Sequence, residues 1–187
     1  MANVNSARGL RLVGHLNGLD PQIRTYYKPV GLATACYVGD PVKSGSSADA
    51  AGEYADIALA AAGDVIRGVI VGFLPVFGTP TVNYSAASLA GYVRVCDDPY
   101  AIYSIQEDSV GNTIAATMIG NNAAIVVASG SATTGYSGTM LDSSTYATTD
   151  AALRILGVAP RPDNAIGTNA EILVMINDHE FKQTTGD

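Results

Sequence analysis

The clearest alternation of apolar and polar residues lies between Gly91 and Ser109. Residues 92–96 and residues 102–106 each alternate with a period of two, which is typical of half-buried strands. Between them stands Asp98-Pro99, where proline lacks the N–H that a ladder needs and the aspartate accepts hydrogen bonds from nearby backbone groups. We predict that this stretch forms the central strand pair of a β-rich domain.

Similar runs, bounded by turn residues, recur along the rest of the chain, and they predict strands near residues 35–38, 64–77, 123–128, 152–158 and 170–177. The last run is the most apolar, so we expect it at the centre of a sheet or at a subunit interface. Gly68 and Gly72 fall on one strand face and predict a bulge or a close backbone approach. Residues 54–62 fit either a strand or a helical turn. Together these runs predict an all-β fold: one β-barrel or jelly-roll-like β-sandwich over residues 30–187, without a repeat or a second domain.

The first 29 residues differ from this body. Asparagine, glycine and proline recur in them too often for a helix to persist, and isolated apolar residues such as Leu10, Leu12, Leu16 and Ile23 are spaced through them. We predict that residues 1–29 form an extended N-terminal arm that is ordered by lying on another surface.

Charge follows the same division. Residues 1–28 carry four basic residues and one acidic residue, a net charge of +3, whereas the remainder carries six basic and sixteen acidic residues. A basic leader on an acidic body is expected to dock onto an acidic surface, either of its neighbour or of a partner. The dense basic patch that nucleic-acid binding needs is absent, and no apolar run is long enough to span a bilayer. We therefore expect neither nucleic acid nor membrane as a partner, and the sequence shows no secretory signal.

The sequence contains few residues that could take part in catalysis or bind a cofactor. Cys36 and Cys96 lie inside predicted strands and are expected to be small buried thiols, although a disulfide is an alternative. His15 and His179 are expected at the surface or at an interface. No nucleophile elbow, phosphate loop or dinucleotide fingerprint is present. We predict that the chain is not an enzyme and has no catalytic, cofactor or metal site.

Acidic residues are the one candidate for an ion site. Asp97 and Asp98, with Glu107 and Asp108 nearby, could gather at one end of the predicted strand pair, where a carboxylate cluster would suit Ca²⁺. Their spacing is not that of an EF-hand, so capping of turns and solvation is the favoured interpretation.

Several segments, in order along nearly the whole chain, resemble small structural proteins encoded beside the major capsid protein in tailed bacteriophages. They include the opening Ala2-Asn3-Val4-Asn5-Ser6-Ala7-Arg8-Gly9-Leu10-Arg11, with residues 15–18, and residues 37–42, 68–73, 95–99, 105–109, 141–144, 153–157 and 161–164. The resemblance implies a capsid decoration, or cement, protein. Such a protein is made in the bacterial cytoplasm and sits on the outer face of the virion head, commonly as a homotrimer. It clamps neighbouring major capsid subunits against the pressure of the packaged DNA.

On this basis we expect residues 3–27 to carry capsid docking. The expected contacts are Arg8, Leu10, Arg11, Leu12, Leu16, Arg24, Tyr26 and Tyr27. The partners would be the major capsid protein and other copies of this chain, in a trimer or a dimer. The alternative is another structural role in the virion, such as head–tail joining or a head-fibre or host-adhesion module.

Overall fold

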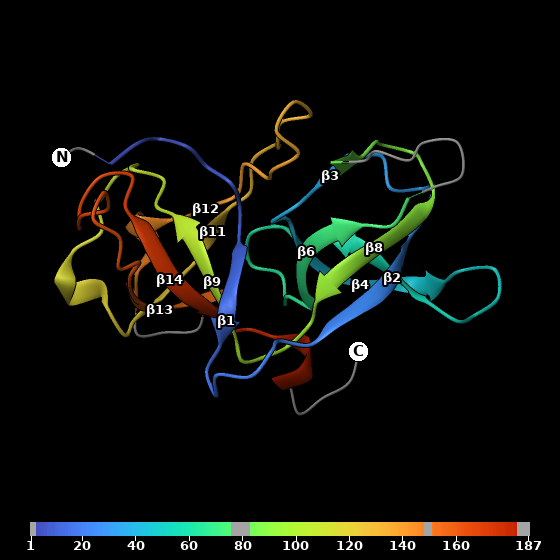
Figure 1. Cartoon of the computed structure of the whole chain (residues 1–187), viewed down its shortest axis with the longest axis horizontal. Coiled ribbons are helices and arrows are strands. Elements are labelled where there is room, and N and C mark those ends of the chain that lie inside the picture. Colours follow the sequence, from blue (N-terminus) through green and yellow to red (C-terminus); the bar gives the residue numbers. More distant parts are fainter. Residues whose placement is uncertain (1–2, 76–82, 148–150, 183–187) are drawn as a thin grey trace.

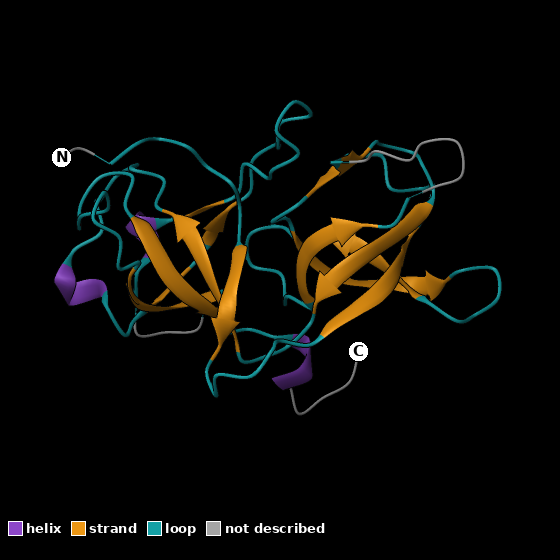
Figure 2. Ribbon diagram, in the orientation of Figure 1, coloured by secondary structure: helices purple, strands orange, loops and turns teal. Residues whose placement is uncertain are grey.

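The computed structural model describes residues 3–75, 83–147 and 151–182. Within these residues the chain is all-β, as predicted, and its strands form several sheets gathered into two lobes (Figure 2). Only three short helices accompany them in this part of the chain, at Ala116–Met118, Ser143–Thr145 and Glu180–Lys182. None of the described helices is long and apolar enough to cross a membrane.

The first lobe is built on a five-stranded antiparallel sheet with the order β1-β9-β14-β13-β10. Its strands are β1 (Arg11–His15), β9 (Ala101–Gln106), β14 (Glu171–Ile176), β13 (Leu153–Val158) and β10 (Asn122–Ala123). Two further short strands, β11 (Ile125–Val126) and β12 (Met140–Leu141), pair with each other. Because β14 lies in the middle of the sheet, the central position predicted for residues 170–177 is confirmed.

The second lobe is a ring of five strands in which each strand pairs with two others. In order around the ring they are β2 (Ile23–Lys28), β5 (Ala55–Leu59), β4 (Pro41–Ala48), β6 (Gly68–Phe73) and β8 (Gly91–Cys96). The small strands β3 (Cys36–Tyr37) and β7 (Tyr84–Ser85) form a separate pair. A single parallel residue pair, Tyr27 with Asp56, joins β2 to β5. The segment 54–62, which the sequence left open, contains a strand and no helix.

The predicted central strand pair is wrong in its pairing, although both of its strands exist. β8 pairs with β2 and β6 in the ring, whereas β9 pairs with β1 and β14 in the five-stranded sheet. Asp98-Pro99 therefore carries the chain from one lobe to the other and does not close a hairpin (Figure 1). An alternating pattern identifies strands, but partners distant in the sequence decide how they pair.

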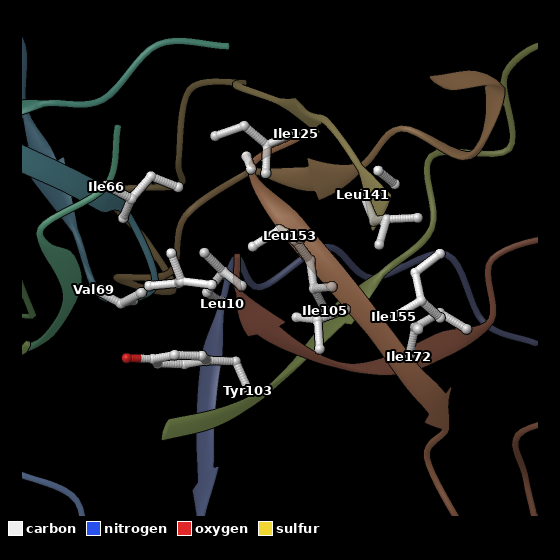
Figure 3. Packing of buried hydrophobic residues seen from close by; sticks show 14 of the residues in the cluster. Leu10, Ile66, Val69, Tyr103, Ile105, Ile125, Leu141, Leu153, Ile155 and Ile172 are labelled. Atoms are coloured by element: carbon white, nitrogen blue, oxygen red, sulfur yellow. The ribbon is translucent and has the colours of Figure 1, made fainter. Parts of the chain in front are cut away.

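The two lobes share buried apolar side chains. The larger core cluster lies on the five-stranded sheet and includes Tyr103, Ile105 and Ile172, but Ile66 and Val69 from the ring lobe also belong to it (Figure 3). A smaller cluster fills the ring and contains Tyr26, Cys36, Val42, Ile57, Ile70, Val93 and Val95. Because the larger core includes side chains from both lobes, neither lobe is packed independently of the other.

Both alternatives predicted for Gly68 and Gly72 occur in β6. A Cβ on Gly68 would lie inside van der Waals contact with the carbonyl oxygen of Cys96 and 2.8 Å from a methyl carbon of Val95. The register of β6 against β8 shifts between Ile70 and Gly72, which marks a bulge at the second glycine.

Residues 1–29 are not uniformly irregular, because they supply β1 to the sheet and β2 to the ring. Leu10 N–H donates to the carbonyl oxygen of Gly39, in the turn between β3 and β4, over 3.0 Å, and Leu10 itself is 1% exposed. Gly9 has a positive φ of 65° beside this contact, where a side chain would meet Gly39. Turn-forming residues predict local irregularity correctly, but the partners β9 and β8 stabilise strands that local propensity does not favour.

Candidate interaction surface

The structure separates the eight residues predicted to dock. Leu10 and Tyr26 are buried, Arg11, Leu12 and Tyr27 are half-buried, and Arg8, Leu16 and Arg24 are exposed. The two buried residues belong to the two core clusters of this chain. A contact with another protein through Leu10 or Tyr26 would therefore need the lobes to open, so these two are corrected from docking residues to core residues.

The basic leader meets acidic groups of its own chain. Arg11 donates to Glu171 over 2.9 Å, and Arg24 lies 3.4 Å from the carboxylate of Asp97. Lys28 is fully buried and its ammonium donates to the carbonyl oxygens of Ala86 and Leu89. Arg8 differs from them. Its guanidinium lies over the ring of Tyr136, 5.7 Å from the ring centre, and it pairs with no carboxylate among the described residues.

Asp97 anchors β2 to the end of β8. The Tyr26 hydroxyl donates to one oxygen of the fully buried Asp97 carboxylate over 2.6 Å, while the other oxygen has no hydrogen-bond partner within the described residues. Burial, with the neighbouring carboxylate, raises the pKa of Tyr26 to about 12. The hydroxyl therefore stays protonated as a donor, and we read this group as a structural contact between β2 and the link to β9.

An exposed apolar surface follows the chain from β1 to β2. Val13, Leu16, Leu19 and Ile23 have exposed side chains, at 56%, 53%, 68% and 37%. We call residues 13–23 the apolar turn; it is the blue turn below β1 in Figure 1. A carboxylate fixes its position, because Asp98 contacts His15 over 3.1 Å and accepts from the Gln22 N–H. Apolar side chains held outward on a fixed turn are suited to contact with a partner.

A polar pocket of about 300 Å³ lies on the other side of the N-terminal segment. Residues 3–9 form one wall, the loop between β13 and β14 forms the second, and β9 with the start of β14 forms the floor. The residues that line it are Asn3, Val4, Ser6, Arg8, Gly9, Arg11, Ser104, Ile105, Gln106, Arg161, Asp163, Asn164, Asn169 and Glu171. The sequence did not single out the pocket residues from β9 onward, because nothing local marks them and only the sheet register brings them together.

The four acidic residues considered for an ion do not gather. Asp97 and Asp98 precede β9 and Glu107 and Asp108 follow it, so six strand residues, roughly 20 Å, separate the two pairs. Capping is confirmed for Asp98, which accepts from the N–H of Tyr100 over 2.9 Å. The prediction that these side chains are solvated is wrong for Asp97 and Glu107, since both are fully buried. Across the described ranges, no group of three or more histidine, cysteine or acidic residues could hold a metal.

The structure confirms the predicted burial of the cysteines but contradicts the prediction for one of the two histidines. Cys36 and Cys96 are free and buried, as expected, and burial raises the pKa of the Cys36 thiol to about 12. His15 is half-buried beside Asp98. His179 contradicts the surface prediction because it is fully buried, and burial together with nearby cationic side chains lowers its pKa to about 4. It is a neutral core residue between β14 and the ring lobe.

Comparison of the chain with protein-family models, with curated proteins and with solved structures found no match.

Proposed function

We propose that this chain is a structural virion protein that binds the outer surface of a bacteriophage capsid and cements neighbouring major capsid subunits. The sequence resemblance supports this proposal, and the apolar turn is the observation that carries it. Its four exposed apolar side chains are carried by one segment that hydrogen bonds to Asp98 hold in place, and exposed apolar side chains on a fixed segment suit contact with a partner. In this role the ring of five strands acts as a small barrel, and the sheet lobe completes a rigid body that self-associates as a homotrimer.

Apolar burial would supply most of the docking energy. Covering the exposed part of Leu16 or Leu19, which is half to two thirds of the side chain, contributes about 1–2 kcal/mol, or roughly tenfold in affinity. The charged part is expected to be small, because Arg11 and Arg24 are already paired within the chain and only Arg8 is available. Raised salt should therefore weaken docking only partly.

The number of copies of this chain in each virus particle tests the proposed role in the capsid. Particles are purified, and this chain is quantified against the major coat protein by gel densitometry. A ratio near one to one supports lattice decoration. A few copies per hundred coat subunits would favour head–tail joining or a head fibre, and absence from particles would contradict any virion role.

Point variants test the surface. Deleting residues 1–29 would remove a strand from each lobe, so single substitutions are the cleaner experiment. Val13→Ser and Leu16→Ser should each weaken binding to undecorated heads by about tenfold without changing the folded state. Val127→Ser is the matched control, since Val127 is 45% exposed but lies outside the apolar turn. Equal effects of Val13→Ser and Val127→Ser would refute docking through this surface.

A further inference from the structure

We infer that the polar pocket between residues 3–9 and the five-stranded sheet is a binding site for a single carboxylate group. The inference goes beyond the proposed function and does not depend on it. The argument starts from Ser104, which is 2% exposed, lines the pocket, and has a hydroxyl with no hydrogen-bond partner among the described residues. A buried hydroxyl without a partner costs about 1–3 kcal/mol, so a donor in this position calls for an acceptor that the chain does not supply.

The sheet register places that hydroxyl beside positive charge. Ser104 stands directly opposite Arg11 of β1, and side chains of directly opposed residues lie on the same face of a sheet. Gln106, two residues further along β9, shares this face and opposes Glu171 of β14. The register therefore places an unused hydroxyl beside a cationic side chain, and that positive charge favours an anionic acceptor at the hydroxyl.

Hydrogen bonds hold the walls in place before any ligand arrives. The Gln106 amide accepts from Ser6 N–H over 2.6 Å and donates to Asn5, which fixes the N-terminal wall. Asn3 donates to two carbonyl oxygens of the loop between β13 and β14, and Asn164 bonds the same loop to Glu171. A pocket with fixed walls loses little conformational entropy when a ligand binds.

Charge selects a monoanion. Three arginines and two carboxylates line the pocket, which leaves one positive charge. Glu171 already accepts from Arg11 and Arg161, and Asp163 accepts from Arg161, so those donors are largely used. Arg8 is the lining arginine whose guanidinium pairs with no described carboxylate, and its planar donor fork suits a carboxylate. A dianion would face the two resident carboxylates with only one positive charge to balance it.

The volume sets the size of the ligand. About 300 Å³ lies at the lower end of the range of small-ligand pockets, roughly 300–1,000 Å³, and is enough for a carboxylate on a short carbon chain. Such a group reaches the pocket either as an acidic side chain of a partner protein or as a free small carboxylate. The chemistry at Arg8 and Ser104 is the same for both sources.

The test is an amide NMR titration of the full chain. The probes are acetate for a free carboxylate and glutamate with both backbone ends capped for a protein-borne one; neutral acetamide and dianionic sulfate are the comparisons. We expect saturable shifts of the Ser6, Gln106 and Asn169 amides with both carboxylates and none with acetamide. Tighter binding of capped glutamate would assign the site to a partner's side chain, and tighter binding of acetate would assign it to a free ligand.

Substitutions in the pocket show whether the amide shifts arise from binding at this site. Arg8→Gln and Ser104→Ala should each weaken the carboxylate affinity by about tenfold, because each removes a donor to a charged acceptor. Arg94→Gln is the matched control, since Arg94 is also exposed but lies on β8, away from the pocket. The inference is overturned if neither carboxylate shifts the pocket amides, if acetamide or sulfate binds as tightly, or if Arg8→Gln and Ser104→Ala bind as the unmodified chain does.

Discussion

Leu10 and Leu16 looked equivalent in the sequence, yet the structure gives them opposite roles, and substituting each by alanine separates these roles. Leu10 is 1% exposed and packs in the core that both lobes share, whereas Leu16 is 53% exposed on the apolar turn. Removing a fully buried leucine costs about 2–5 kcal/mol of unfolding free energy, which for a chain of this size lowers Tm by roughly 4–20 °C. Removing an exposed one changes the free energy of unfolding by about 0.5 kcal/mol or less.

Urea unfolding followed by circular dichroism measures the first effect, and binding to undecorated heads measures the second. We expect Leu10→Ala to shift the urea midpoint strongly, and Leu16→Ala to leave that midpoint unchanged while weakening docking. A Leu10→Ala chain as stable as the unmodified protein would refute the burial of the N-terminal segment between the lobes. Equal loss of docking in both variants at a temperature where both are folded would refute the division between core and surface.

Three further outcomes follow from other parts of the chain. Gly68→Ala should destabilise the ring lobe by about 1–3 kcal/mol in urea unfolding because its Cβ has no room, whereas Gly72→Ala meets nothing within 4 Å and should be near neutral; equal effects would contradict the close approach. His179 has a pKa near 4 when folded against its ordinary 6.5, so stability should fall by at most about 3 kcal/mol as the pH drops from about 6.5 to about 4, and His179→Asn should flatten that profile; parallel profiles would show that other groups cause it. Cys36 and Cys96 are buried, so a maleimide should label them slowly in the native protein and fast in guanidinium, and rapid native labelling would count against their burial.

The sequence predicted individual strands better than their arrangement. Periodicity located β8, β9, β13 and β14, and the glycines of β6 indicated a bulge or a close approach, of which both occur. It did not indicate that β8 and β9 separate into different lobes, because a turn of Asp98-Pro99 fits a hairpin and a crossing equally well. The choice between them depends on pairing with segments many residues away.

Burial within the N-terminal 29 residues was the hardest feature to predict. Spaced leucines, tyrosines and arginines fit an arm on a foreign surface, and they fit equally a segment that packs against its own chain. Leu10 and Tyr26 are buried in this chain's own cores, whereas Leu16 is exposed. The polar pocket escaped prediction for the same reason: Ser104 carries no signal until β1 and β14 lie on either side of it.

The division of strands between the lobes also has a consequence for synthesis on the ribosome. Every strand of the ring lies between residues 23 and 96, so that lobe has all of its strands when about half of the chain has been made. The five-stranded sheet needs β14, which ends at Ile176, to join β9 to β13. Chains emerge N-terminus first, and domains generally fold as they become complete. During translation β1 and β9 therefore emerge well before the strand that completes their sheet, and the core that the two lobes share, which includes Ile66 and Val69, is complete only when β14 arrives.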